Sequence, residues 1–351
     1  MIKIAISDCC IQKDKYFCAA RDYNLIFTVD KNEKKIELFA TLPEYKAYDS
    51  CIGGIKAYGD FLIILTLNGN YNWIINQKTG EKICIYKGEE YYESQPGFTQ
   101  AYKYNNLIYM IGAGYAAIIC VNMDDYSVRY ITAPYKECEI RGKNKNDAYF
   151  KHQGVVVDDK MYLASMRDNY VLEFNLKNEK YKWIKVGSEE NRYSGIIYDE
   201  GVFWMAPRLN TGIVRWEKGG IEEIVLPDGF ESKDAFFFGI GRCGKDIILP
   251  NMKEKRSIRI DSMTREKEEI SECYIFMNMI DDSTLAGQLS SGVLRISTSE
   301  TVKDYPIMID EYYLMEFFKN NNIETNRASD KPLLESEIFD VKFFLSYLKS
   351  F

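Results

Sequence analysis

Short apolar segments separated by polar turns recur along this chain with a period of about 45 residues. Each copy holds a small residue, an apolar run, a polar turn, a second apolar run and a polar loop, as in GGIKAYGDFLIILTLNG and YSGIIYDEGVFWMAPRLN. The second runs begin at Tyr16, Phe61, Leu107, Met161, Val202, Asp246 and Thr284, at intervals of 45, 46, 54, 41, 44 and 38 residues. A repeat of this length predicts an array of identical structural units.

Each copy continues with two further strand-like segments, such as YVLEFNLKN and KYKWIKVG in the fourth copy. Four short strands in about 45 residues are typical of a β-propeller blade. Runs such as FLIILTL are apolar on both faces, as expected for a strand buried between two neighbouring blades. We therefore predict an all-β, seven-bladed propeller of four-stranded antiparallel blades over residues 1–307, or a six-bladed one if the last copy is degenerate. No helical periodicity is expected in that range.

The repeats resemble those of bacterial members of the broad propeller class that includes Kelch and WD40 proteins. The double glycine of Kelch repeats occurs once, as Gly53-Gly54, and no copy has the Trp-Asp ending of WD40 repeats. The resemblance covers residues 1–307 and implies an architecture without a specific activity.

Composition limits the partners and the location. The formal charge of the 351 residues is −7, which argues against non-specific nucleic-acid binding. No apolar run approaches 18 residues, and MIKIAISDCC does not read as a signal peptide, so we expect no membrane contact and a cytoplasmic location. Nine scattered cysteines predict buried thiols. The single histidine excludes a multi-histidine metal centre, and we expect no metal and no cofactor.

The chain after residue 307 differs from the repeats and is expected to be a helical extension, residues 308–351. DEYYLMEFFKNNN predicts a short helix with Asp310 as its N-cap. An amphipathic helix over 334–351 follows, with its apolar stripe formed by Leu334, Ile338, Val341, Leu345 and Leu348. We expect this helix either to dock on the propeller or to pack against a partner or a second copy of the chain.

Loops on one face of a propeller surround the mouth of its channel, and we expect a site there. The entry to the fourth copy holds His152 and Gln153, and the entry to the third holds Gln100 at the position of Gln153. Arg192 and Tyr193 precede the fifth copy in the same way. His152 beside Gln153 suits acid–base chemistry or ligand binding, and the alternative is a structural histidine bonded to backbone.

Arginines recur in the loops between second and third strands. Arg21-Asp22 and Arg167-Asp168 are predicted to share a repeat position in the first and fourth copies, with Arg208 there in the fifth. Guanidinium groups above a channel can hold a carboxylate or phosphate with two hydrogen bonds. The alternative is a local Arg–Asp ion pair that stiffens each loop.

Two further segments bear on function. The charged connection 134–151, which ends beside His152, is the longest between copies and suggests a lid over the mouth. GIGRCG at 239–244 matches a nucleotide-binding glycine pattern, but DIILP follows it as a strand, so we interpret it as a blade hairpin.

No motif indicates catalysis with certainty, and the sequence favours a binding protein over an enzyme. The predicted function is a non-catalytic scaffold that recognises a peptide, a protein or a small polar ligand at the channel mouth. The predicted ligand-binding residues are Arg21, Gln100, His152, Gln153, Arg167, Asp168, Arg192, Tyr193 and Arg208. The alternative is a metal-independent hydrolase or lyase that acts on a carbohydrate or peptide with His152 as its acid or base.

Overall fold

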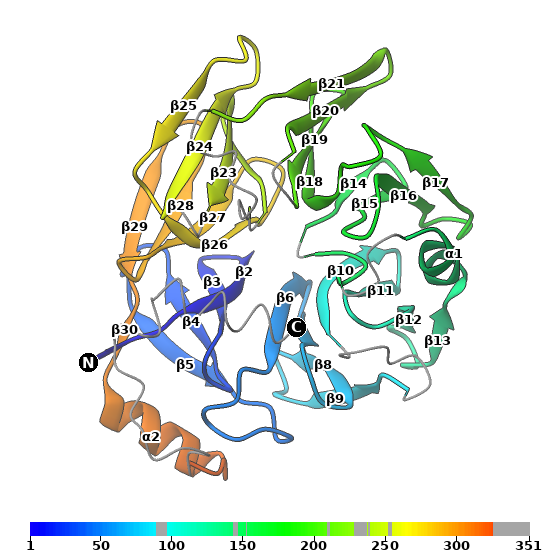
Figure 1. Ribbon diagram of the computed structural model, residues 1–351. Helices are drawn as coiled ribbons and strands as arrows, with labels where there is room; N and C mark the ends of the chain where they lie inside the picture. The colour runs from blue at the N-terminus through cyan, green and yellow to red at the C-terminus, as the bar shows by residue number, and fades with distance from the viewer. Residues whose placement is uncertain are drawn as a thin grey trace.

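Seven four-stranded antiparallel sheets stand around a central axis in the computed structural model (Figure 1). The structure describes residues 1–88, 97–142, 147–151, 153–208, 211–227, 237, 239–251 and 255–325. In every sheet the strands follow one another in chain order from the axis outward, so each sequence repeat forms one blade. The predicted seven-bladed propeller is therefore confirmed.

The blades are numbered 1 to 7 in chain order. Blade 1 contains β2 (Ile6–Gln12), β3 (Lys15–Ala20), β4 (Ile26–Asp30) and β5 (Ile36–Ala40), and blade 2 contains β6 (Ile52–Tyr58), β7 (Phe61–Thr66), β8 (Tyr71–Asn76) and β9 (Lys82–Tyr86). Blade 3 contains β10 (Phe98–Tyr104), β11 (Leu107–Gly112), β12 (Ile118–Asn122) and β13 (Val128–Ile131), and blade 4 contains β14 (Val155–Val157), β15 (Lys160–Ala164), β16 (Tyr170–Asn175) and β17 (Tyr181–Lys185).

The second half of the ring repeats this arrangement. Blade 5 contains β18 (Tyr193–Asp199), β19 (Val202–Pro207), β20 (Ile213–Glu217) and β21 (Gly220–Ile224), and blade 6 contains β22 (Gly241–Cys243), β23 (Asp246–Asn251), β24 (Arg256–Asp261) and β25 (Lys267–Ile270). Blade 7 contains β26 (Tyr274–Met279), β27 (Leu285–Leu289), β28 (Val293–Ser297) and β29 (Val302–Pro306). The GIGRCG segment enters β22 and turns into β23, so it is a blade hairpin as predicted.

The apolar core lies between adjacent blades. Ile63 and Ile74 of blade 2, for example, pack in one cluster with Met110 and Ile119 of blade 3, and all four side chains are fully buried. Inner strands lose both faces to such contacts, which explains their near-continuous apolar runs. The outermost strands β21 and β25 are largely exposed and carry charged residues.

One backbone hydrogen bond recurs in six of the seven blades. In five of these blades the residue directly after the second strand donates its N–H to a carbonyl at the entry of the same blade's first strand, and in blade 4 the donor is the second residue after that strand. The pairs are Arg21–Ala5, Leu67–Cys51, Ala113–Gly97, Met166–Tyr149, Arg208–Arg192 and Ser290–Cys273, with N–O distances of 2.7 to 3.0 Å. This bond ties each loop between second and third strands to the connection that enters the blade, so both lie on one side of the ring, here called the loop face.

The ring closes between blade 7 and blade 1. The short strands β1 (Ile2–Lys3) and β30 (Met308–Ile309) pair antiparallel beside the closing blades. Gln288 of blade 7 accepts a hydrogen bond from Ile6 N at 2.7 Å and donates one to Ile4 O at 2.8 Å. The Gln288 contacts join the chain's beginning to blade 7, and the β1–β30 pair joins it to the segment that follows blade 7.

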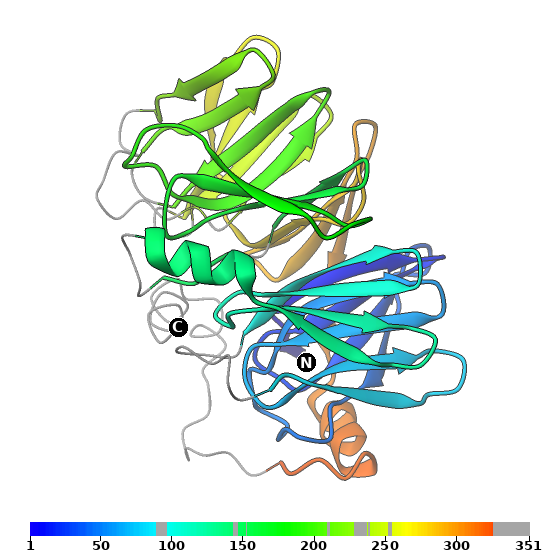
Figure 2. The same cartoon turned by 90° about the vertical axis from the view of Figure 1, so that its right-hand side faces the viewer.

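Two helices are present in the described part of the chain. α2 (Glu311–Asn320) lies beside blade 1 (Figure 1), and the Asp310 side chain accepts a hydrogen bond from Tyr313 N at 2.9 Å, so the predicted N-cap is confirmed. α1 (Ala133–Arg141) lies at the ring's loop face between blades 3 and 4 (Figure 2), where no helix was predicted. Neither helix has the length and apolar character needed to cross a membrane. The helix predicted over 334–351 lies outside the described residues.

Candidate functional site

The inner strands share a β-bulge close to the loop face. It occurs at Ile6/Asp8, Ile52/Gly54, Phe98/Gln100, Tyr193/Gly195 and Tyr274/Phe276. Counting back from each hairpin gives Gln153 in blade 4 and Gly239 in blade 6 as the matching residues. We call this set the ring position: Asp8, Gly54, Gln100, Gln153, Gly195, Gly239 and Phe276.

The register of blade 4 corrects two sequence predictions. β15 begins at Lys160, one residue before the expected Met161, so Gln153 and not Gly154 matches Gly195. The recurring backbone bond pairs Arg21 with Met166, so Arg21 and Arg167 do not share a repeat position. The first error arises because apolar alternation does not fix where a strand begins when its first residue is a lysine. The second arises because the shared Arg-Asp dipeptide suggests a match, although Arg21 lies six residues after the start of β3 and Arg167 lies seven residues after the start of β15.

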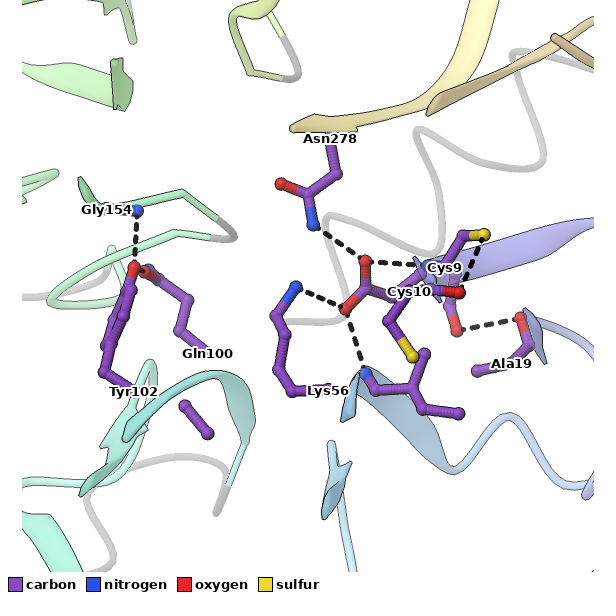
Figure 3. Close-up of polar contacts among 12 residues, drawn as sticks. Cys9, Cys10, Ala19, Lys56, Gln100, Tyr102, Gly154 and Asn278 are labelled. Atoms are coloured by element: carbon purple, nitrogen blue, oxygen red, sulfur yellow. Dashed lines mark hydrogen bonds and ion pairs between the residues drawn. The ribbon is translucent and has the colours of Figure 1, made fainter. Parts of the chain in front are cut away.

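The Asp8 side chain makes more hydrogen bonds than any other described side chain at the ring position, and its partners Cys9, Lys56 and Asn278 are labelled in Figure 3. It is 3% exposed, and its Oδ1 accepts hydrogen bonds from Cys9 N and from Asn278 Nδ2, both at 2.8 Å. Its Oδ2 accepts from Ile55 N at 2.9 Å and from Lys56 Nζ at 3.1 Å. One buried carboxylate thus joins blades 7, 1 and 2, and Lys56 balances its charge.

Gln100 and Gln153 serve as links between blades. Gln100 Nε2 donates to Lys151 O, and Tyr102 donates its hydroxyl to Gln100 Oε1 while accepting from Gly154 N at 3.1 Å (Figure 3). Gln153 is 5% exposed, and its Nε2 has no acceptor among the described residues. Both predicted residues therefore lie where the channel meets the loop face.

α1 fixes one side of the loop face. Arg141, its last residue, donates from Nε to Asp168 Oδ2 at 2.6 Å. The guanidinium carbon lies 4.0 Å from the ring centre of Tyr170 and 4.3 Å from that of Trp183. A cation held between two aromatic faces and a carboxylate has a defined orientation. The connection 134–151 is thus folded onto blade 4 through the predicted residue Asp168.

Arg167 and Arg208 meet the same connection. Arg167 is 3% exposed, donates from Nε to Asp147 O at 2.8 Å, and lies 3.7 Å above the Tyr149 ring. Arg208 Nη2 lies 3.0 Å from Asp147 Oδ1. Lys151 is 8% exposed, and burial together with the nearby Arg208 holds its pKa well below the usual range, although Asp147 acts in the opposite direction.

These contacts define a group that we call the arginine cluster: Arg141, Asp147, Lys151, Arg167, Asp168 and Arg208. The sequence identified three of its members and treated the connection that supplies Arg141, Asp147 and Lys151 only as a lid. Thr132 before Pro134 was the available signal that this connection begins with a helix.

The remaining predicted residues, which do not belong to the arginine cluster, are Arg21, Arg192, Tyr193 and His152. Arg21 is buried and pairs with Asp22 at 3.2 Å, which is the local ion pair considered as the alternative. Arg192 is joined to Arg208 by the backbone bond described above, and its Nε is buried without an acceptor among the described residues. Tyr193 is fully buried and donates its hydroxyl to Val186 O at 2.6 Å. His152 lies outside the described residues.

Few of the described side chains near the arginine cluster are suited to covalent catalysis. The nearest thiol, Cys138, lies 3.8 Å from Ser165 Oγ, and burial raises its pKa to about 12, which keeps it protonated and weakly nucleophilic. All nine cysteines are free thiols, and seven of them are buried. No group of three His, Cys, Asp or Glu side chains suited to a metal occurs among the residues searched, which are the described ones.

A cavity of about 310 Å³ lies on the opposite side of the ring, between blades 3 and 4. It is lined by the β10–β11 turn and the β16–β17 turn, and an ion pair between Arg129 and Glu179 spans it. Similar contacts join the outer strands of other neighbouring blades, as between Arg265 and Glu222 or Lys34 and Asp304 O. This recurrence indicates that the Arg129–Glu179 pair is a clip between blades.

Comparison with known proteins reaches only the fold. No protein-family model and no curated protein matches the sequence. The chain is similar to a catalytically inactive virginiamycin B lyase from Staphylococcus aureus with quinupristin, at 15% identity and a TM-score of 0.62, over 82% of this chain and 92% of that one. It is also similar to BamB from Moraxella catarrhalis (12% identity, TM-score 0.55, 86% and 89% covered) and to the WD40 repeats of RRP9 (8%, 0.57, 82% and 87%). These likenesses show a propeller architecture and nothing finer.

Proposed function

We propose that this propeller is a non-catalytic binding protein whose loop face recognises a peptide, a protein or a small polar ligand through an anionic group. The observation that carries the proposal is the composition of the arginine cluster. Three of its six described residues are arginines, and each can bind a carboxylate or phosphate through charge-assisted hydrogen bonds. The cluster occupies the loops that most propellers leave available to ligands.

Lys151 is the fourth cationic residue of the cluster, and its surroundings are buried. Lys151 and Arg208 repel each other where little water reaches Lys151, as the lowered pKa of Lys151 reflects. A carboxylate or phosphate placed beside Arg208 would relieve the repulsion and accept charge-assisted hydrogen bonds. We infer that an acidic side chain of a peptide partner, or the anionic group of a small molecule, supplies this charge.

The cluster is also held in a fixed arrangement. Arg141 stacks between two rings and Arg167 lies on a third, so binding would immobilise few additional side chains. A preorganised site loses less conformational entropy on binding and gains affinity for that reason. The cytoplasmic location and the self-association through residues 334–351 remain predictions from the sequence.

Fluorescence anisotropy with matched peptide pools tests the proposal. One pool carries Asp and Glu at random positions, and the second replaces them with Asn and Gln. We expect binding of the acidic pool, a loss of about tenfold or more in R208Q, and weakening as salt increases. The control R259Q removes an arginine from the outer surface of blade 6 and should bind normally. Equal binding of both pools, or an unchanged R208Q variant of wild-type stability, would contradict the proposal.

The enzymatic alternative, a hydrolase or lyase that uses His152, stays a prediction. Its residue lies outside the described part of the chain, and the contacts given above for the arginine cluster do not include an activated nucleophile. The lyase likeness does not favour it, because 15% identity carries no residue assignment to this chain.

A further inference from the structure

The Asp8 carboxylate sits at the ring position with its hydrogen-bonding capacity filled. Two backbone N–H groups, one amide and one ammonium group contact its two oxygens at 2.8 to 3.1 Å. A carboxylate has about four acceptor positions, so Asp8 has none left for a ligand. Its role is to hold Lys56 and Asn278 in place.

Lys56 and Asn278 retain unused capacity on the same side of the network. Lys56 carries three N–H donors, and Asp8 is its acceptor among the described residues. Asn278 donates a hydrogen bond from Nδ2 to Asp8, and no donor in the described part of the chain reaches its Oδ1. A strong donor and an amide acceptor therefore lie next to each other, both fixed by one carboxylate.

Lys56 lies on β6, the innermost strand of blade 2, and is partly exposed. In Figure 3 its side chain lies between the Gln100–Tyr102 pair on one side and Cys9 and Cys10 on the other. The Lys56 side chain is 20% exposed, whereas that of Asp8 is 4% exposed. The Lys56 side chain is thus partly accessible to solvent, whereas the Asp8 side chain that orients it is buried.

From this geometry we propose that Lys56 and Asn278 form a second ligand site, inside the channel, for a neutral group that both accepts and donates a hydrogen bond. A hydroxyl of a sugar or polyol has this property, and so does a primary amide. Lys56 donates to the ligand's oxygen, and Asn278 Oδ1 accepts from its O–H or N–H. The site is independent of the arginine cluster.

The charge balance of the Asp8–Lys56 pair favours a neutral ligand over an anionic one. Asp8 already neutralises Lys56, so a bound anion would leave one uncompensated negative charge in a mostly buried network. A neutral ligand leaves the charge balanced. This distinguishes the channel site from the loop face, where the arginines favour an anionic group.

The network's cost is a second argument. A buried ion pair contributes little net stability, because removing two charges from water offsets their attraction. Apolar clusters already pack neighbouring blades together, blades 1 and 2 included. An oriented ammonium group in a channel is therefore better explained by a contact that it makes with a ligand.

The test uses acetamide and acetate, which have nearly the same shape and differ in charge, with glucose as the hydroxyl probe. Saturation-transfer NMR measures the weak binding expected for single groups. We expect saturable binding of acetamide or glucose, weaker binding of acetate, and a loss of about tenfold in K56M and in N278L, as for a hydrogen bond to a charged group. Whichever neutral probe binds more tightly identifies the source of the ligand group.

Controls separate this site from structural effects and from the loop face. K103M removes an exposed lysine from β10 and should bind acetamide normally, and R208Q should do so too. If K56M unfolds, the D8N/K56M variant removes both charges together and serves in its place. Absence of saturable binding in the wild type, tighter binding of acetate than of acetamide, or wild-type affinity in a folded K56M or D8N/K56M variant would show that the network is only a clamp between blades.

Discussion

Gln153 Oε1 accepts a hydrogen bond of 2.8 Å from the backbone N–H of Ile240, which lies 87 residues further along the chain and two blades away. The side chain passes blade 5 at Gly195, where an added Cβ would lie 3.0 Å from Gln153 Oε1. The same oxygen lies 2.9 Å from the Cβ position of Gly239. Glycines at the ring position thus leave room for a neighbour's side chain or backbone.

The tightest of these approaches predicts a stability effect at Gly54. A Cβ on Gly54 would lie 2.5 Å from the backbone oxygen of Thr99 in blade 3, and a backbone atom cannot move aside without displacing its strand. We expect Gly54→Ala to lower the free energy of unfolding by about 1–3 kcal/mol, as overpacking does elsewhere. Denaturant unfolding measures the change. Gly219→Ala is the matched control, because no atom lies within 4 Å of its Cβ position, and equal stability of the two variants would refute the argument.

Buried Lys87 predicts a pH dependence of stability. Its side chain is fully buried, contacts Thr66 O at 3.2 Å and Asn68 O at 3.1 Å, and burial lowers its pKa to about 7. The unfolded chain, with an ordinary lysine pKa near 10.4, binds more protons than the folded one above pH 7. Stability from this group therefore increases with pH, by up to about 1.4 kcal/mol per unit between pH 7 and 9.

Lys87→Met should remove that contribution. Urea unfolding at pH 6, 7, 8 and 9 compares the slopes of the two proteins, and the variant should gain stability relative to wild type at pH 6, where the wild-type lysine is charged. Lys218→Met alters an exposed lysine and should reproduce the wild-type slope. Parallel curves for wild type and Lys87→Met would mean that Lys87 titrates normally.

The propeller architecture could be predicted from the sequence because every blade repeats the same pattern of apolar runs and polar turns. Because the pattern occurs in seven copies, the prediction of the fold stays correct even when one copy is misaligned. The predicted register of a blade, by contrast, depends on that copy alone. Blades 1 and 4 begin their second strands at Lys15 and Lys160, one residue earlier than predicted. In blade 4 that slip placed Gly154 where Gln153 belongs. The match of Arg167 to Arg21 had a different origin, the Arg-Asp dipeptide that the two loops share.

The candidate site was less accessible, for a different reason. Arg167 and Asp168 were identified as neighbours in sequence, yet each contacts the connection before blade 4 and not the other as a pair. Asp8, Lys56 and Asn278 come from three blades, and only the closed ring brings them together. A charged residue within an apolar inner strand, as Asp8 is, was the available signal.

Arg141 predicts how firmly α1 is attached to blade 4. Its guanidinium stacks on Tyr170 and Trp183 and bonds Asp168, so Arg141→Gln should cost about 1–3 kcal/mol and reduce the protection of α1 amides. Hydrogen exchange with mass spectrometry reports on residues 133–141 directly. Arg141→Lys keeps the charge but lacks the planar guanidinium group. Its α1 amides should therefore be less protected than those of the wild type and more protected than those of Arg141→Gln. Unchanged protection in Arg141→Gln would show that Tyr135 and Cys138 alone hold the helix.

Gln288 predicts the strength of the ring closure. It is fully buried and satisfies two backbone groups at the chain's beginning, Ile6 N and Ile4 O. Gln288→Leu keeps the size of the side chain but leaves both groups without partners, so we expect a loss of about 2–4 kcal/mol in the free energy of unfolding. Exchange of the amides near Ile6 should accelerate more than exchange in blade 4. Gln77→Leu is the control, because the Gln77 Nε2 has no acceptor among the described residues and its removal should be neutral or stabilising. If Gln288→Leu is as stable as Gln77→Leu, then the pairing of β1 with β30 closes the ring without help from this side chain.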